Sequence, residues 1–362
     1  MKTDTTNAKV NREDLYQRAE RELRGMRVRE ASELFLSAEL AGCNADTCAA
    51  GRWTCHMLNG DFEKAWRESD SIAARGSIDP NRFWNGQPLE GRRVLIRCLH
   101  GLGDTIQFVR YAPLILEQSS FLILEVQPTL KELIQHSALA DAVITWGEPE
   151  PAWDVQLEVI EIPRIFRTDL TTIPNRVPYL RAPQAGEILR PHSGALRVGM
   201  VWRSSKYNPA RSVPAAIMAE LFDIPGVEFY SLQAGQERFE LGPWRDRAPS
   251  LFDEDRCVLA AASAVQALDL VITVDTMMAH LAGALGKPVW TLLPFQCDWR
   301  WMLERGDSPW YPTMRLFRQE HLGDWRAVMR RVKRELAALS QTGMPVRRTD
   351  ACYQSAGPGR LK

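Results

Sequence analysis

Apolar residues recur at spacings of three and four along the first part of the chain, which is the period of an amphipathic helix. The positions that share this spacing are Leu15, Ala19, Leu23, Ala31, Leu34, Phe35 and Ala38. They predict two or three short antiparallel helices between residues 12 and 75. A weak internal repeat supports this interpretation, because Glu30-Ala31 and Lys64-Ala65 lie 34 residues apart, each after a Gly-containing turn.

Beyond residue 91 the pattern changes to short apolar runs separated by segments of helical length. Strands are predicted over 93–98, 121–126 and 142–145 and, in a second series, over 196–202, 227–232, 270–274 and 288–293. Helices are predicted over 105–118, 129–136, 215–222, 258–267 and 277–285. A long terminal helix over 324–339 is indicated by Trp325, Val328, Met329, Val332 and Leu336. Such alternation is typical of parallel sheets with right-handed crossovers, so the fold class is α/β.

The same pattern predicts the domain organisation. The 34-residue period is that of a tetratricopeptide repeat, so residues 1–78 are expected to form a short all-α region that either binds a protein partner or caps the next domain. A linker over 79–91 opens a Rossmann-like domain over 79–190, whose irregular end, 153–190, is taken as a hinge. A second Rossmann-like domain covers 191–322 and faces the first across a cleft. A terminal helix over 323–341 packs back, and the Gly-, Pro- and Ser-rich tail over 342–362 is expected to be disordered.

Composition narrows the classes of partner. Lys plus Arg and Asp plus Glu both number 45, so the net charge is zero and no overall field favours nucleic acid or an anionic membrane. The polar N-terminus has no secretion signal, and no run approaches the ~18 apolar residues of a spanning helix, so a cytoplasmic location is expected. The seven cysteines form no CxxC pair. Cys43, Cys48, Cys55 and His56 lie in a helical pattern and are interpreted as packing residues rather than metal ligands.

The first candidate site is the turn His100-Gly-Leu-Gly-Asp-Thr105, between a predicted strand and its helix. Open α/β sheets bind ligands at the carboxyl ends of their strands, where this turn lies. Asp104 is either the N-cap of the helix or a group that projects into the cleft. A nicotinamide dinucleotide is disfavoured, because Ile106 replaces the third glycine of the fingerprint and the loop ends on an acid.

The second candidate site is Val274-Asp-Thr-Met-Met-Ala-His280. A helix that begins near Thr276 or Met277 directs its free N–H groups and the positive end of its dipole into the cleft, which creates an anion site. His280 lies one turn further and can donate a proton to a phosphate, while Asp275 can accept hydrogen bonds from sugar hydroxyls. A local hydrogen-bonding role for His280 is the alternative.

Together the two segments resemble the heptosyltransferase family, glycosyltransferase family nine, and more closely bacterial proteins that join tetratricopeptide repeats to such a domain. The resemblance runs from Trp84 to Leu339 and rests on residues 97–113, on 274–288 and on Asp307-Ser-Pro-Trp-Tyr-Pro312. Asp104 and Asp275, one in each main motif, are 171 residues apart. The resemblance implies a GT-B fold with the acceptor on the first domain and the donor on the second.

The resemblance also implies residue roles. Asp104 matches the catalytic base, which takes a proton from the acceptor hydroxyl as the anomeric carbon is inverted. Arg211 matches a basic residue that neutralises the diphosphate. The expected donor-binding residues are Arg211, Gln233, Asp275, Thr276, Met277 and His280, with Gln233 near the nucleobase. The expected acceptor-loop residues are Arg97, Gly101, Gly103, Thr105 and Gln107. The chain departs from the family at Met277, where a glycine is usual, and at Arg97, where many members have lysine.

The predicted function is an inverting transfer of a sugar from an ADP-heptose-like nucleotide-sugar to a saccharide or protein hydroxyl. No cofactor and no metal are expected, because Asp253-Glu-Asp255, which has the DxD spelling, lies in a charged loop. The alternatives are a non-catalytic binding or assembly module with a degenerate transferase domain, and a nicotinamide-dependent oxidoreductase. Around the cleft, four aromatic residues either stack on sugars or pack against the terminal helix. They are Trp299, Trp301, Trp310 and Tyr311.

Overall fold

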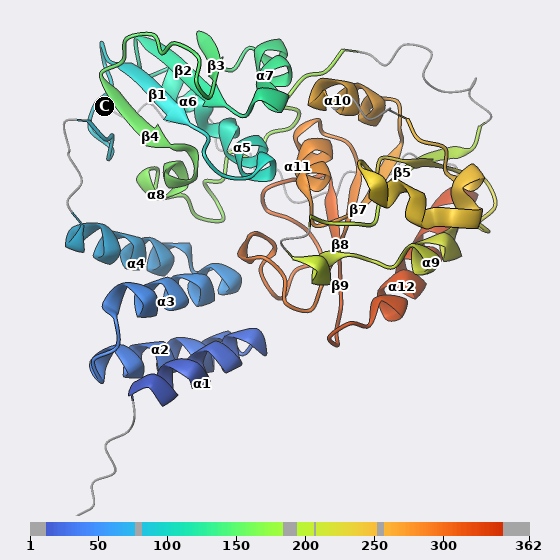
Figure 1. Ribbon diagram of the computed structural model, residues 1–362, viewed down its shortest axis with the longest axis horizontal. Coiled ribbons are helices and arrows are strands. Elements are labelled where there is room, and N and C mark those ends of the chain that lie inside the picture. The colour runs from blue at the N-terminus through green and yellow to red at the C-terminus, as the bar shows by residue number, and fades with distance from the viewer. Residues whose placement is uncertain (1–11, 77–81, 184–193, 206–207, 252–256, 343–362) are drawn as a thin grey trace, which may run out of the picture.

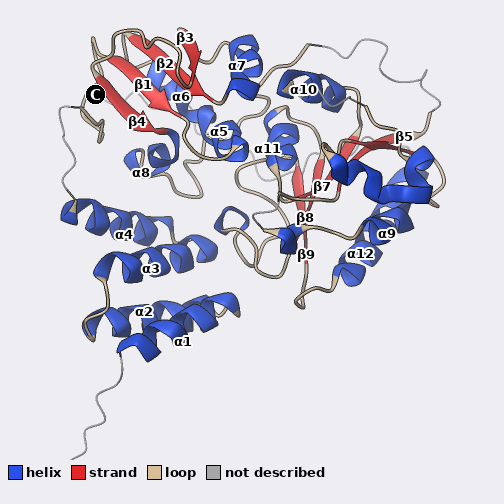
Figure 2. Ribbon diagram, viewed as in Figure 1, coloured by secondary structure: helices blue, strands red, loops and turns tan. Residues whose placement is uncertain are grey.

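The computed structural model describes residues 12–76, 82–183, 194–205, 208–251 and 257–342. A layer of helices from the N-terminal region lies beside two α/β units, each built on its own sheet (Figure 1; Figure 2). Of the expected tail over 342–362, Thr342 is the last residue of the terminal helix; residues 343–362 and the acidic stretch 253–255 lie outside the described residues. None of the helices in the described ranges combines the length and the apolar composition that crossing a membrane requires.

The N-terminal region contains four helices, so the prediction of two or three was wrong. They are α1 (Arg12–Arg24), α2 (Val28–Leu40), α3 (Ala45–Asn59) and α4 (Phe62–Arg75). The turns between them are only a few residues long, which hid one boundary in the apolar pattern. Asn44 caps α3 by accepting the Thr47 N–H at 3.0 Å, and Gly60 ends it with a φ of 80°. Because α2 and α4 begin 34 residues apart, the tetratricopeptide assignment stays a prediction with the right spacing.

The first α/β unit has a parallel four-stranded sheet in the order β3-β2-β1-β4. Its strands are β1 (Arg93–Arg97), β2 (Phe121–Val126), β3 (Ala142–Thr145) and β4 (Val155–Glu158), and its helices are α5 (Leu102–Phe108), α6 (Ala112–Leu116), α7 (Lys131–Ser137) and α8 (Ile162–Ile165). The helix predicted over 105–118 begins earlier and is divided by the 3-10 turn η1 (Val109–Tyr111).

Strand β4 corrects the predicted hinge and linker. It lies inside the stretch interpreted as an irregular domain end, and it pairs with the central strand β1. Part of the expected linker also joins this edge, because the backbone N–H of Trp84 donates to the Gln156 carbonyl oxygen at 2.9 Å and the Trp84 side chain is buried. The pattern Val-Gln-Leu-Glu has only two apolar residues, which is too few for a strand to be recognised from a continuous apolar run.

The second unit has a parallel five-stranded sheet in the order β6-β5-β7-β8-β9. Its strands are β5 (Leu196–Val201), β6 (Val227–Ser231), β7 (Leu270–Val274), β8 (Val289–Leu293) and β9 (Met314–Arg318), and its helices are α9 (Ala215–Met218), α10 (Val258–Gln266), α11 (Met277–Ala284) and α12 (Trp325–Thr342). β9 and the 3-10 segment η6 (Gln236–Arg247) were not predicted. In α12 all five predicted apolar positions are buried, which confirms its inner face.

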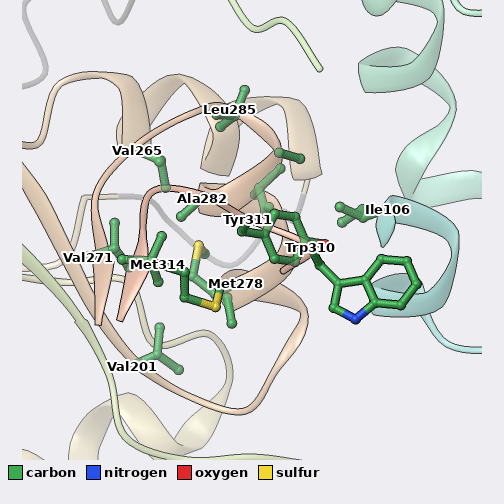
Figure 3. Packing of buried hydrophobic residues seen from close by; sticks show 14 of the residues in the cluster. Ile106, Val201, Val265, Val271, Met278, Ala282, Leu285, Trp310, Tyr311 and Met314 are labelled. Carbon is green, nitrogen blue, oxygen red and sulfur yellow. The ribbon is translucent and has the colours of Figure 1, made fainter. Parts of the chain in front are cut away.

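The three parts meet around aromatic side chains near the end of the second unit. The Trp53 and Trp299 rings lie 5.3 Å apart, and Phe62 of α4 stacks on Trp310 at 6.1 Å. Trp310 and Tyr311 reach from the second unit toward Ile106 of α5 (Figure 3). The helical region therefore rests on both α/β units, as the cap alternative predicted.

Candidate active site

Asp104 lies in the first turn of α5, directly after the loop at the carboxyl end of β1. Gly101 is the N-cap, and Asp104 Oδ2 accepts the Gly101 N–H at 3.0 Å, so this carboxylate closes the helix start from the third helical position. Of the two alternatives, the N-cap assignment is wrong. The other oxygen, Oδ1, accepts a hydrogen bond from Arg300 of the second unit. The carboxylate therefore faces the domain boundary.

Arg300 was not predicted. It lies in η7 (Trp299–Trp301), in the segment that follows β8, and Asp298 starts this turn by accepting the Arg300 N–H at 3.0 Å. The Arg300 guanidinium binds Asp104, donates from Nε to Gln107 Oε1 at 2.6 Å, and donates from Nη1 to Asp298 Oδ1 at 2.9 Å. The sequence signal for Arg300 is its place between two tryptophans beyond the end of a strand. The sequence pattern draws attention to the tryptophans and not to the arginine.

Asp275 and Thr276 stand between the end of β7 and the start of α11. Thr276 is the N-cap of α11, and its hydroxyl accepts the Met278 N–H at 3.3 Å. Asp275 is buried, and its Oδ2 lies 3.5 Å from Nη1 of Arg211. Burial, together with the nearby Asp298, raises the pKa of Asp275 to about 6, although Arg211 opposes the shift. The expected helix start, cation and carboxylate therefore lie together.

His280 is buried in the first turns of α11. Its Nδ1 is 2.9 Å from the Tyr311 hydroxyl, and its ring stacks on Trp301 with centroids 5.3 Å apart. Burial and three cationic side chains hold the pKa of His280 well below its usual range, so the ring is neutral. These cations are Arg300, Arg110 and Arg211.

The two candidate turns are in direct contact. A Cβ added to Gly103 would lie 2.9 Å from Cδ2 of His280, closer than ordinary packing allows. Glycine at this position is required because α5 and α11 approach each other across the domain boundary. The turn that contains Asp104 and the turn that begins α11 therefore lie against each other at the domain boundary.

Other expected site residues take different roles in the structure. Arg97 turns to the neighbouring strands, where it binds Glu125 Oε2 at 2.7 Å and Gln156 Oε1 at 2.6 Å. Gln233 Oε1 accepts the backbone N–H groups of Trp202 and Arg203, at 3.2 and 2.9 Å. Both side chains are held by protein groups rather than directed at Asp104. The remaining ones also lie near the turns: Gly101 and Met277 flank them, and Thr105 is buried and bound to Gln127.

Arg110 is a buried cation that the sequence analysis did not single out. It is 3% exposed, and its hydrogen bonds go to the Gln107 carbonyl at 2.6 Å, the Trp310 carbonyl at 2.5 Å and the Tyr179 hydroxyl at 2.9 Å. All three acceptors are neutral. Because they come from different segments on both sides of the boundary, Arg110 fixes α5 relative to the second unit.

The aromatic cluster belongs to the core. Trp301, Trp310 and Tyr311 are fully buried, so they have no exposed face for a sugar. They pack between the units and not on α12. The cysteine interpretation holds for the two buried thiols, because burial raises the pKa of Cys48 to about 11 and that of Cys55 to about 12. Across the described ranges, no three His, Cys, Asp or Glu side chains are grouped closely enough to hold a metal ion.

Replacement of Asp275 by Asn should make the protein more stable than the wild type, and this advantage should grow as the pH rises. In the unfolded chain this carboxyl titrates near 3.8, and in the folded protein near 6, so between these values the folded state holds the extra proton. Ionisation of the buried group therefore removes stability as the pH rises through this window, and the neutral amide avoids that loss. The advantage of Asp275→Asn in the free energy of unfolding should grow by up to about 3 kcal/mol from pH 4 to pH 7.5.

Urea unfolding at several pH values, followed by far-ultraviolet circular dichroism, measures this difference. Other titrating groups, including His280, are common to both proteins and cancel in the comparison. A difference between variant and wild type that does not change with pH would contradict a raised pKa at Asp275.

No sequence-family model matches the chain. The chain is 27% identical over 349 residues to Protein FlbA of Caulobacter vibrioides, an alignment that covers 82% of this chain and 58% of FlbA. The chain thus matches little more than half of the length of that relative.

Solved structures extend the comparison to the fold. A glycosyl transferase of family 9 from Veillonella parvula aligns over 72% of this chain and 99% of its own, with a TM-score of 0.53 and 12% identity. The ADP-heptose lps heptosyltransferase II of E. coli aligns over 69% of this chain and 99% of its own, with a TM-score of 0.50 and 14% identity. The predicted fold class is confirmed: beyond its helical region, this chain shares the fold of these two glycosyltransferase structures.

Proposed function

We propose that this chain is an inverting, metal-independent glycosyltransferase that moves a sugar from a nucleotide-diphosphate sugar to a hydroxyl of a saccharide or a protein. The observation that carries the proposal is the meeting of Asp104 with the start of α11 at the domain boundary. A carboxylate from one sheet and a cationic, N–H-rich turn from the other are the two groups that this reaction requires.

Asp104 acts as the base in the proposed reaction. The acceptor hydroxyl attacks the anomeric carbon of the donor, and its proton passes to the Asp104 carboxylate as the new carbon–oxygen bond forms. The bond between the anomeric carbon and the phosphate oxygen breaks, and the nucleoside diphosphate leaves with its electron pair. Because base and leaving group belong to opposite domains, attack comes from the side opposite to the leaving group, which inverts the anomeric carbon.

Fixed protein charges support departure of the diphosphate without a metal. Arg211 and Arg300 lie beside the start of α11, and both remain cationic at neutral pH. Nδ1 of the neutral His280 lies 2.9 Å from the Tyr311 hydroxyl. In the proposed reaction this hydroxyl donates to Nδ1, and Nε2 then carries the ring proton and donates it in a hydrogen bond to a phosphate oxygen. Thr276 and Met277 supply the first backbone positions of the helix, where N–H groups are free for an anion.

The fold likeness makes an ADP-linked heptose the first donor to test, since one aligned structure is an ADP-heptose heptosyltransferase. We further propose that the protein acts in the cytoplasm and that the four-helix region, as a pair of tetratricopeptide-like repeats, offers a surface to a protein partner. Gln233 and Arg97 are proposed to act through backbone and strand contacts rather than by touching the reacting atoms.

A donor screen by mass spectrometry tests the proposed function. The full chain is incubated with ADP-, UDP- and GDP-linked sugars, with and without saccharide acceptors, and release of the nucleoside diphosphate is scored. We expect release from one donor class in the presence of EDTA, and a release lower by about 10²-fold or more from Asp104→Asn. Nucleotide binding without release from any donor would favour the alternative, a non-catalytic module with a degenerate transferase domain.

A further inference from the structure

Arg300 joins the two halves of the site more directly than any residue that the sequence pointed to. Its side chain is 13% exposed, and it lies against the Trp299 ring, 4.6 Å from the centroid. Each of its three nitrogens has its own acceptor, one on Asp104, one on Gln107 and one on Asp298. Two of these acceptors belong to α5 of the first unit and one to the second.

This arrangement occupies both oxygens of the proposed base. Asp104 Oδ1 accepts from Arg300, and Oδ2 accepts the Gly101 N–H at 3.0 Å. The second bond belongs to the helix start and is present whenever α5 is formed. Oδ1 is therefore the oxygen that can take a proton from an acceptor hydroxyl. While the Arg300 guanidinium is bound to it, the positive charge favours the ionised carboxylate and opposes uptake of that proton, so Asp104 becomes an effective base when the guanidinium moves.

An anion bound at the start of α11 can draw the Arg300 guanidinium away from Asp104. Trp301, the residue after Arg300, stacks on His280 with centroids 5.3 Å apart, and Gly103, beside Asp104, packs against the same ring. An anion bound beside His280 therefore also lies near the guanidinium. A diphosphate carries more negative charge than one carboxylate and offers two oxygens to the planar guanidinium fork.

Gln107 gives independent evidence that a ligand binds next to Arg300 and Asp104. Within the residues that the structure describes, its Nε2 is buried and has no hydrogen-bond partner, although its Oε1 accepts from Arg300. A buried amide donor without an acceptor costs about 1–3 kcal/mol, so its retention next to the pair calls for an acceptor that arrives later. A phosphate oxygen is such an acceptor.

We propose that Arg300 is a donor-controlled latch: it holds Asp104 while the site is empty and transfers to the diphosphate when the donor binds, which frees the base. The inference rests on the proposed function and adds an order of binding to it, donor before acceptor. Arg300 is in this sense a positioning residue for Asp104 and a ligand of the donor anion.

A double-mutant cycle on nucleotide binding tests the latch without any turnover. Isothermal titration calorimetry gives the dissociation constants of ADP, UDP and GDP for the wild type, Asp104→Asn, Arg300→Met and the double variant, all as full chains. Asp104→Asn removes the charge that competes for Arg300, so it should bind the preferred nucleotide on the order of tenfold more tightly. Arg300→Met should weaken binding by a similar factor, and in that background Asp104→Asn should have no further effect.

Simple repulsion between Asp104 and the diphosphate makes a different prediction. It would give tighter binding on Asp104→Asn in both backgrounds, and that result would overturn the latch. If Arg300→Met does not fold, Arg300→Lys replaces it: it keeps the charge but cannot reach three acceptors, so the gain from Asp104→Asn should shrink. Equal binding by wild type and Asp104→Asn overturns the latch and leaves the proposed function in place. No binding by either protein overturns both.

Discussion

Turnover should fall by about 10²–10⁴-fold when Asp104 is replaced by Asn, which is the range that a positioned general base contributes. The amide is nearly the same size as the carboxylate and can still accept a hydrogen bond from Arg300, but it cannot take up the acceptor proton. Initial rates of nucleoside diphosphate release, measured with saturating donor and acceptor, give the change in kcat. Binding of the nucleotide should persist, so the loss belongs to chemistry and not to affinity.

Asp154→Asn is a matched control for the structural effect of this change. Asp154 also accepts a backbone N–H, that of Arg93 at 2.7 Å, but at the opposite end of β1 from Asp104. Both substitutions weaken one carboxylate-to-backbone hydrogen bond, which is worth about 1 kcal/mol in stability. Asp154→Asn should therefore show a comparable loss of stability and retain turnover. Full turnover in Asp104→Asn would remove the base assignment.

The sheets show which parts of the fold the sequence could predict. β2, β3 and β7 have the predicted bounds, because each is a largely apolar, β-branched stretch with clear ends. β4 and β9 were missed: the first is half polar, and the second has two arginines among its five residues, so neither contains a long apolar run. Their strand character comes from pairing with β1 and β8, and that pairing is a tertiary interaction that no local pattern contains.

The site residues also divide into those that a local sequence pattern predicts and those that depend on tertiary contacts. Asp104, Asp275 and His280 were found because strand-end turns of parallel sheets are local features that gather at one edge. Arg300 was not found, because it bonds to a residue 196 positions away and its own segment reads as an aromatic loop. Arg97 shows the converse, since its place at a strand end was predicted correctly and its direction was not. Neighbouring Glu125 and Glu150 attract its guanidinium, and their position depends on strand order.

The largest loss of stability is expected for Trp310→Ala. Trp310 is fully buried and contacts Phe62 of the helical region, Phe108 of the first unit and Trp299 of the second. Its removal leaves a cavity where all three parts meet, and large aromatic residues truncated in a core lower the free energy of unfolding by about 3–5 kcal/mol. Urea unfolding of the full chain, followed by circular dichroism at 222 nm, measures this loss. The helical region should then unfold at lower urea than the sheets, because the stacking of Phe62 on Trp310 is lost.

Two further variants separate the cavity from other effects. Within the described residues, Nε1 of Trp310 is buried without a hydrogen-bond partner, so Trp310→Phe keeps a ring and gives up no hydrogen bond. Its loss should be smaller, about 1–2 kcal/mol. Trp146 is 46% exposed, and Trp146→Ala should change stability by no more than about 0.5 kcal/mol. If Trp310→Ala were as mild as Trp146→Ala, the three parts could not be held together by this side chain, and Arg110, which binds the Trp310 carbonyl, would have to be the main link between them.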